Sequence, residues 1–421
     1  MLKRNCLIAT EPRRDLREPR RSTEPFASLC GSVAILVITT FTACSGAESN
    51  TEVPDHILEM ENVTVYSSNY LREADTLGFI KDQTFGDSKD LIIGHIGAIA
   101  VDEEERLVLY DGHQSAKTIH QFSPTGEYIR QIGREGRGPG EYLSGSQLNM
   151  SNNHLLVFDR TLNRHLVYSV ETGEHLQTVQ IDPANMQSED PITHLRLGGY
   201  HKLNNELFLL SLARAQRYYE DEPGTTRYFI TDSEFRELSP EIFRLNRRLE
   251  NFGEWQGMWI MSFFPFHSRS LLSISESGRI YTAVSDEFFI RELNHEGETI
   301  GGFYYPYERK PLNRREALRD IHEREKNIVE NMPIPDYWPV LDRMFSDDED
   351  RLWIATETDE TEPQKWYVTE SNGELVGTFN WPKESVLRMV KNGFLYAVEN
   401  NSDSGIQQVV RYRIEIGDQD A

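Results

Sequence analysis

Cysteine is nearly absent from this chain of 421 residues, and the positions of its few copies are informative. The only three are Cys6, Cys30 and Cys44, so residues 45–421 carry no thiol. This excludes disulfides, cysteine-ligated zinc sites and cysteine nucleophiles from that part of the chain. A folded unit without such cross-links needs a large hydrophobic core of its own, and residues 45–421 are long enough to build one.

Positive charge is also scarce. The chain has 44 lysines and arginines against 68 aspartates and glutamates, which gives a formal net charge of −24 at pH 7. Such a surface repels nucleic-acid phosphates and anionic headgroups, and it therefore argues against nucleic acid as a partner. We interpret the acidity as a solvated surface rather than as a dedicated cation-binding function.

Recognisable catalytic and cofactor motifs are missing as well. The histidines between residues 95 and 175 are scattered, and no two have a spacing that would place two metal ligands on one element. Gly136, Gly138 and Gly140 superficially resemble a phosphate-binding loop, but no Lys-Ser/Thr follows and Pro139 has no N–H. We therefore expect a protein that is not an enzyme and that requires no cofactor.

One complete repeat unit is present between residues 99 and 142. Its apolar runs are separated by short polar turns, at Ile99–Val101, Leu107–Tyr110, Thr118–Phe122 and Tyr128–Ile132. This pattern is typical of a four-stranded antiparallel meander, which here is followed by a glycine-rich loop. One such sheet cannot bury both of its faces, so it has to stack on copies of itself.

The copies of this unit can be counted from its second strand. Its pattern recurs at Leu107–Asp111, Leu155–Asp159, Leu207–Ser211, Ile280–Val284, Leu352–Thr356 and Leu395–Glu399. Six four-stranded blades predict an all-β fold, the six-bladed β-propeller. The last copy ends after the strand that begins at Val409, so we predict that Glu61–Tyr66 supplies the missing strand and closes the ring.

Three segments carry a resemblance to a known family. They are the first blade with Ala100-Val101-Asp102 and Leu109-Tyr110-Asp111, the loop Gly133–Tyr142, and the stretch beginning PDYWPVLD at Pro335. In these segments the chain resembles the six-bladed β-propeller lipoproteins of Bacteroidota-like bacteria, which are related to NHL-repeat proteins. The likeness covers residues 60–416. It implies a lipoprotein outside the cytoplasm.

The N-terminus predicts the compartment. Seven basic residues precede an uncharged run from Phe26 to Cys44, which reads as a secretion signal. The run ends in Phe41-Thr42-Ala43-Cys44, which looks like a bacterial lipobox, so we predict lipidation of Cys44. The alternative is an uncleaved anchor, because the run is just long enough to span a bilayer as a helix. Both place the following residues outside the cytoplasm, in the periplasm or at the outer membrane.

The predicted organisation has four parts. They are a lipoprotein signal peptide at residues 1–44, a flexible tether at 45–59, a propeller at 60–416 and a C-terminal tail at 417–421. We expect a monomer held at the membrane by its lipid anchor.

The long insertions should all lie on one face of the propeller. They are Ala213–Thr226, Ser239–Phe266, Tyr304–Val340 and the glycine-rich loop, whereas the hairpins of the opposite face are short. Lengthened loops on one face of a repeat scaffold are commonly its binding surface. Between blades 4 and 5 we predict a helical insertion, which begins at a capping box of Asn313 and Glu316 and has an apolar face of Leu318, Ile321, Ile328 and Met332.

Aromatic and arginine side chains in these insertions favour recognition. The predicted ligand-binding residues are Arg134, Arg137, Trp255, Trp259, Tyr337 and Trp338. Such side chains stack on sugar rings or anchor a peptide, so we expect an extracytoplasmic glycan, peptide or protein as the partner. The alternative is that the rings only pack the insertions onto the propeller.

An enzymatic alternative remains at the sequence level. Some NHL-like and lactonase-like propellers are metal-assisted hydrolases or lyases, and Asp111 and Asp159 end equivalent strands where they could hold Ca²⁺. An aspartate at such a position more commonly accepts hydrogen bonds from the backbone of its own turn. We favour that interpretation, and with it a binding protein over a hydrolase.

Overall fold

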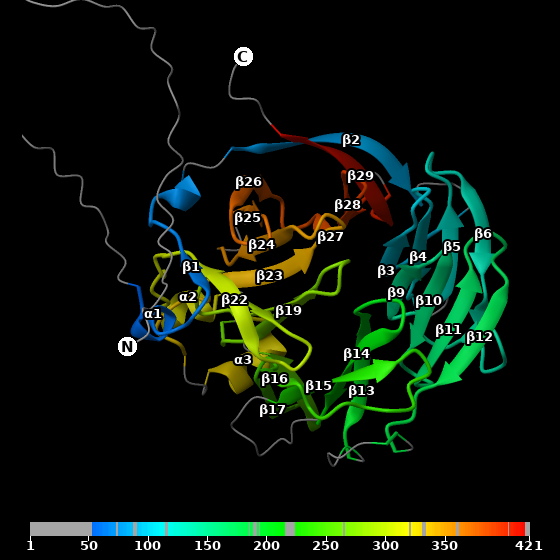
Figure 1. Cartoon of the computed structure of the whole chain (residues 1–421), viewed down its shortest axis with the longest axis horizontal. Helices are drawn as coiled ribbons and strands as arrows, with labels where there is room; N and C mark the ends of the chain where they lie inside the picture. The colour runs from blue at the N-terminus through cyan, green and yellow to red at the C-terminus, as the bar shows by residue number, and fades with distance from the viewer. Residues whose placement is uncertain are drawn as a thin grey trace, which may run out of the picture.

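A computed structural model gives the fold (Figure 1). It describes residues 53–416 apart from 73–74, 87–90, 114–116, 185, 188–191, 193, 215–223, 264–265, 320, 331–333, 359–361 and 403. The expected signal peptide, Cys44 and the C-terminal tail lie outside these residues. Within the described part of the chain, no helix is long and apolar enough to cross a membrane.

Six antiparallel sheets are arranged in a ring around a central axis (Figure 1). Blade 1 comprises β3 (Ile96–Val101), β4 (Leu107–Asp111), β5 (Thr118–Phe122) and β6 (Tyr128–Ile132). Blade 2 comprises β9 (Gln147–Ser151), β10 (His154–Asp159), β11 (Arg164–Ser169) and β12 (His175–Gln180). Blade 3 comprises β13 (Arg196–Lys202), β14 (Leu207–Ala213), β15 (Thr225–Asp232) and β16 (Phe243–Asn246).

The second half of the ring repeats this order. Blade 4 comprises β19 (Ser270–Ile274), β20 (Ile280–Val284), β21 (Phe289–Leu293) and β22 (Thr299–Tyr304). Blade 5 comprises β23 (Leu341–Ser346), β24 (Leu352–Thr356), β25 (Gln364–Thr369) and β26 (Leu375–Trp381). Blade 6 comprises β27 (Val386–Lys391), β28 (Phe394–Asn400), β29 (Gln407–Ile416) and β2 (Leu77–Phe85). All six predicted second strands are confirmed, as β4, β10, β14, β20, β24 and β28.

The hydrophobic core consists mainly of clusters between neighbouring blades. Between blades 1 and 2, for example, Val108 and Tyr110 pack with Leu155 and Val157, and all four are buried. Comparable clusters lie at the other five blade junctions, including the one where blade 6 meets blade 1. Each sheet therefore buries both faces against its neighbours, as the repeat pattern predicts.

The ring is closed by β2, and not by the strand predicted from sequence. β2 pairs antiparallel with β29, from Leu77 opposite Ile416 to Phe85 opposite Val409. Figure 1 shows the two strands side by side, in blue and red. The predicted donor Glu61–Tyr66 instead contains β1 (Val63–Val65), which pairs parallel with β22 as a fifth strand of blade 4. The principle of closure by an N-terminal strand holds, but the strand was assigned wrongly.

The segment before β1 is folded against blade 4. The helix α1 (Asp55–Leu58) lies inside the stretch predicted as a flexible tether. Ile57 of this helix is 1% exposed and packs with Val63, Phe289 and Tyr304. Hydrophobic contact therefore fixes residues 55–58, so the ordered part of the chain begins before residue 60.

The short hairpins between first and second strands are held by a repeated hydrogen-bond pattern. Asp102 Oδ1 accepts from the N–H groups of Glu104 (3.0 Å) and Arg106 (2.8 Å). Asp347 Oδ1 accepts in the same way from Glu349 (3.0 Å) and Arg351 (2.8 Å). The acidic run that begins at Asp347 is therefore a hairpin turn.

The helical insertion between blades 4 and 5 is smaller than predicted. It contains α2 (Arg314–Ala317) and α3 (Glu323–Val329) in place of one continuous helix, and the imidazole of His322 accepts from Arg324 N–H at the start of α3. Leu318 and Ile321 still pack on a local core with Trp338. Ile328 contacts Gly253 of the preceding insertion, and Met332 lies outside the described residues.

The remaining short elements also lie outside the four-stranded pattern. They are the 3₁₀ turn η1 (Tyr70–Arg72), the parallel pair β7 (Arg134–Glu135) and β8 (Glu141–Tyr142), and the hairpin of β17 (Glu250–Trp255) and β18 (Met258–Phe263).

Candidate functional site: two mouths of the central channel

The first strands of the six blades surround a central channel. By chain direction, one mouth lies at the hairpins between first and second strands, which we call the hairpin face. The other lies at the connections between blades and between second and third strands, which we call the insertion face. The β17–β18 hairpin, the α2–α3 segment and the β7–β8 loop all connect one blade to the next, so they belong to the insertion face.

Four arginines gather around the channel at its insertion face. Arg248 precedes β17, Arg269 precedes β19, Arg343 is in β23 and Arg388 is in β27. Arg269 Nη2 donates to Asp342 O at 2.6 Å, and Arg343 Nε lies 3.3 Å from Asp342 Oδ2. Arg388 Nη2 donates to Ile96 O at 3.3 Å, across the junction of blades 6 and 1.

Bulges in the first strands help to place two of these charged residues. The register of β23 skips Asp342, between Leu341 and Arg343. The register of β27 skips Arg388, between Leu387 and Met389. A bulge turns one side chain out of the regular alternation.

The positive charges of this group are not fully compensated. Burial and the neighbouring Arg269 lower the pKa of Arg248, and burial and Arg343 lower the pKa of Arg388. Burial and the negative charge of Asp342 raise the pKa of Glu357, directly after β24, to about 7. Because Glu357 is partly protonated near neutrality, Asp342 is the main fixed negative charge among four arginines. Neighbouring atoms bury part of Arg248 and Arg388, but these residues and Arg343 keep solvent-exposed surface, so a ligand from solution can reach them.

The predicted site residues Arg134 and Arg137 lie in the β7–β8 loop on the same face. Arg134 is 75% exposed and pairs with Glu141 at 2.6 Å. Arg137 is exposed, and its carbonyl accepts from Arg164 Nη1 at 3.2 Å. No described contact joins either arginine to the predicted aromatic residues.

Trp255 and Trp259 lie on the β17–β18 hairpin. Trp259, Met261 and Phe263 share one face of β18 and are 68%, 46% and 41% exposed. The other face of the hairpin is covered by α3, where Ser262 Oγ donates to Glu325 Oε2 at 3.3 Å. The hairpin therefore presents a row of apolar side chains to solvent.

Tyr337 and Trp338 differ in their environments. Tyr337 is 42% exposed, and the guanidinium of Arg309 lies 4.8 Å from its ring centroid. Trp338 is only 7% exposed and packs edge-to-face on Phe266, with the centroids 4.6 Å apart. Burial of this kind supports the packing alternative for Trp338.

Asp111 and Asp159, the alternative metal ligands, are occupied by the backbone. Asp111 accepts hydrogen bonds of 3.0 Å from the N–H groups of Gly94, His95 and His113. Asp159 accepts from the backbone N–H groups of Leu143, Thr161 and Leu162. Across the described ranges, no three His, Cys, Asp or Glu residues are grouped so that they could hold a metal ion.

The arginine group and Glu357 were missed in the sequence. A polar residue that lines a channel looks like any surface residue, and bulges have no clear sequence pattern. The sequence holds one weak signal for these arginines. An Arg-Met pair recurs in two first strands, at Arg343-Met344 and Arg388-Met389.

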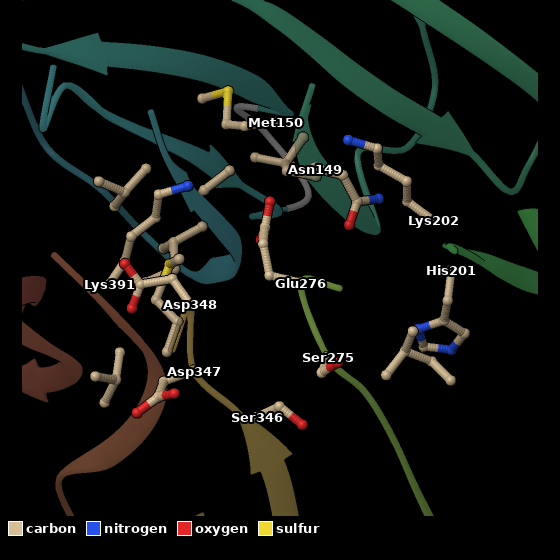
Figure 2. Close-up of a pocket in the computed structure, with 17 residues that line it drawn as sticks. Asn149, Met150, His201, Lys202, Ser275, Glu276, Ser346, Asp347, Asp348 and Lys391 are labelled. Carbon is tan, nitrogen blue, oxygen red and sulfur yellow. The ribbon is translucent and has the colours of Figure 1, made fainter. Parts of the chain in front are cut away.

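The hairpin face has a cavity of its own at the opposite mouth. Its volume is about 190 Å³, and all six blades contribute lining residues. Figure 2 shows Asn149, Lys202, Glu276, Asp348 and Lys391 around it.

Sequence comparison agrees with this architecture. Residues 47–248 match a family model described as "6-bladed beta-propeller". This chain is a six-bladed β-propeller. No curated protein matches its sequence.

Solved structures with related shapes include propellers of several kinds. A protein of Bacteroides fragilis NCTC 9343, proposed to be exported, has 12% identity and a TM-score of 0.49, over 82% of this chain and 98% of that chain. Calcium-binding regucalcin of Agrobacterium tumefaciens has 10% identity and a TM-score of 0.36, over 79% and 95%. Virginiamycin B lyase of Staphylococcus aureus has 10% identity and a TM-score of 0.35, over 81% and 89%. These similarities give no information on a ligand or an activity.

Proposed function

We propose that this propeller is an extracytoplasmic binding protein without catalytic activity, and that it holds an acidic glycan at the insertion face. The observation that carries the proposal is the group of Arg248, Arg269, Arg343 and Arg388 around the channel mouth. In a chain with a net charge of −24, four arginines around one opening leave a local excess of positive charge. An anionic ligand would supply the missing negative charge.

The chemistry of the group fits carboxylate or sulfate. A guanidinium is planar and offers paired N–H donors, which match two oxygens of one anionic group. Arg343 and Arg388 are on neighbouring blades, so successive acidic groups of one polymer have separate partners. Trp259, Met261 and Phe263 lie in the same connection between blades 3 and 4 as Arg248. Their exposed side chains offer an apolar surface for sugar rings.

The N-terminal segment is consistent with attachment to a membrane on this side. His56 Nε2 lies 2.9 Å from Glu287 Oε2, in the loop between the second and third strands of blade 4. Eight residues separate Cys44 from Val53, and nine extended steps of chain reach about 30 Å. A lipid on Cys44 would therefore keep the insertion face close to the membrane.

Binding of purified protein to immobilised polymers tests this proposal. The probes are polygalacturonate, chondroitin sulfate and neutral dextran. We expect binding to at least one acidic polymer and none to dextran, with affinity that falls as salt is raised. Arg343→Met and Arg388→Met should each weaken binding about tenfold or more.

A matched control separates the site from general charge. Arg413 lies on β29 in the outer part of blade 6, and its side chain is 58% exposed. Arg413→Met removes the same charge and should leave binding unchanged. Equal loss in all three variants, or binding only to a protein or peptide array, would contradict the acidic-glycan assignment. Hydrolysis of a bound polymer would contradict the absence of catalysis.

A further inference from the structure

The cavity at the hairpin face is built by the ends of all six first strands. Its apolar wall includes Ile99, Leu148, Ile274 and Met389, one residue from each of four blades. Its polar groups come mostly from the last residues of the strands and from the hairpins that follow, and Asn149 comes from the middle of β9 (Figure 2). One side of a small molecule would thus meet apolar side chains, while the other would meet charges.

Two polar atoms at this cavity are buried without a hydrogen-bond partner. They are the amide nitrogen Asn149 Nδ2 and the carboxylate oxygen Asp348 Oδ1. Asp348 Oδ2, in contrast, accepts from Asn392 N–H at 2.8 Å. A buried donor or acceptor without a partner is energetically costly, so a bound group that hydrogen-bonds to such an atom would be stabilised.

Two charged side chains at the same cavity also lack an ion pair among the described residues. They are Lys202, at the end of β13, and Glu276, directly after the end of β19, and the described residues give neither a salt bridge. Lys391, by comparison, is paired with Glu103 at 2.7 Å. Figure 2 shows Glu276 and Asn149 extending into the open space, with Lys202 beside Asn149.

We infer that this cavity binds a free α-amino acid with an apolar side chain. The carboxylate of the ligand meets Lys202 Nζ and Asn149 Nδ2. Its ammonium group meets the Glu276 carboxylate. The side chain lies along the apolar wall, where burial of hydrocarbon adds to the affinity.

Other ligand classes fit these groups less well. A simple anion would satisfy Lys202 and Asn149 but would be repelled by Glu276 and Asp348. A metal ion would be repelled by Lys202 and Lys391, which carry positive charge at the same mouth. His201 adds no charge near neutral pH, since burial lowers its pKa to about 4. A zwitterion is the class that pairs with both signs at once.

This site is independent of the proposed glycan site. The two occupy opposite mouths of the channel and share no residue. Loss of one activity in a variant therefore does not predict loss of the other.

Calorimetric titration with L-leucine and two derivatives tests the inference. N-acetyl-L-leucine lacks the ammonium charge, and L-leucine methyl ester lacks the carboxylate. We expect L-leucine to bind at least about tenfold more tightly than either derivative, since each lacks one charge-assisted contact. No binding of L-leucine, L-methionine or L-phenylalanine at about 10 mM would overturn the inference.

Two variants test which side chain binds the carboxylate of the ligand and which binds its ammonium group. Lys202→Met should weaken L-leucine binding and remove its advantage over the methyl ester, while the advantage over the N-acetyl compound persists. Glu276→Gln should produce the reverse pattern. Lys81→Met, an exposed residue of β2 on the outside of blade 6, should change neither. If both cavity variants keep the wild-type pattern, L-leucine binds elsewhere and the assignment is wrong.

Discussion

Arg411 Nε donates a 2.6 Å hydrogen bond to Asp82 Oδ2, although the two residues are 329 positions apart in the sequence. The same guanidinium donates from Nη1 to Glu105 Oε2 of blade 1 at 2.9 Å. Its side chain is only 9% exposed. One arginine thus joins β29, the closing strand β2 and the first blade, at the junction where the ring ends meet.

Truncation of a β2 core residue should destabilise the whole ring. Phe85 is fully buried between Phe122 and Tyr396, with ring centroids 6.4 and 6.5 Å away. We expect Phe85→Ala to lower the free energy of unfolding by about 3–5 kcal/mol, because it leaves a cavity between blades 6 and 1. Ile80→Ala on the same strand removes a side chain that is 44% exposed and should cost far less. Urea unfolding measures both, and equal effects would contradict closure through Phe85.

Glu357 should make stability fall as the pH rises. Its pKa is raised from 4.5 to about 7, so the folded state binds this proton more tightly than the unfolded state. The resulting stabilisation is complete below pH 4.5 and is lost as the pH rises through about 7. Glu357→Gln cannot lose this proton, so it should be more stable than wild type at pH 8 by about 1–3 kcal/mol. Little difference should remain at pH 4.5.

Thermal unfolding of wild type and Glu357→Gln at both pH values measures this effect. The exposed Glu61 provides a control, and Glu61→Gln should not alter the pH dependence. A pH profile that is unchanged in Glu357→Gln would show that another group is responsible.

The two tryptophans Trp259 and Trp338 should separate binding from packing. Trp259 is 68% exposed, so Trp259→Ala should weaken glycan binding with little loss of stability. Trp338 is 7% exposed, so Trp338→Ala should cost about 3–5 kcal/mol of folding free energy. Paired binding and unfolding measurements test this. Failure of Trp259→Ala to fold would mean that its ring is structural.

Asp111 should act through its backbone contacts. Asp111→Ala leaves three loop N–H groups without their acceptor, and we expect a loss of about 1–3 kcal/mol. The melting temperature of wild type should not respond to a chelator or to added Ca²⁺. A chelator-sensitive wild type whose response disappears in Asp111→Ala would favour the metal alternative instead.

Mass spectrometry of the intact protein can detect lipidation of Cys44. Protein extracted from membranes should begin at Cys44 and carry a diacyl or triacyl modification, which should be absent from Cys44→Ala. An unmodified chain that retains residues 1–43 would support the uncleaved anchor.

The sequence predicted the blades because second strands are buried on both faces. β4 and β24 are buried at every position, and such runs stand out from the polar turns around them. The closing strand was harder to find, because β2 is an outer strand and its middle residues Lys81 and Asp82 are exposed. The more apolar Val63–Val65 resembled a strand more closely, yet it packs beside blade 4.

The candidate sites were less predictable than the blades. Exposed Trp259 and buried Trp338 are both aromatic residues in insertions, and only packing distinguishes them. Arg388 lies near Ile96, although the two are 292 positions apart. Such neighbours follow from closure of the ring, which composition and local periodicity do not encode.

The pairing of β2 with β29 also sets an order of events during synthesis of the chain. Phe85 emerges early in synthesis, but its partner Val409 is among the last residues to appear. Until then, β2 has an unpaired edge and Phe85 has no completed core to enter. A chain that is made from its N-terminus therefore presents its closing strand first and can use it only once β29 has followed, so exposure to aggregation or proteolysis lasts until the ring is closed.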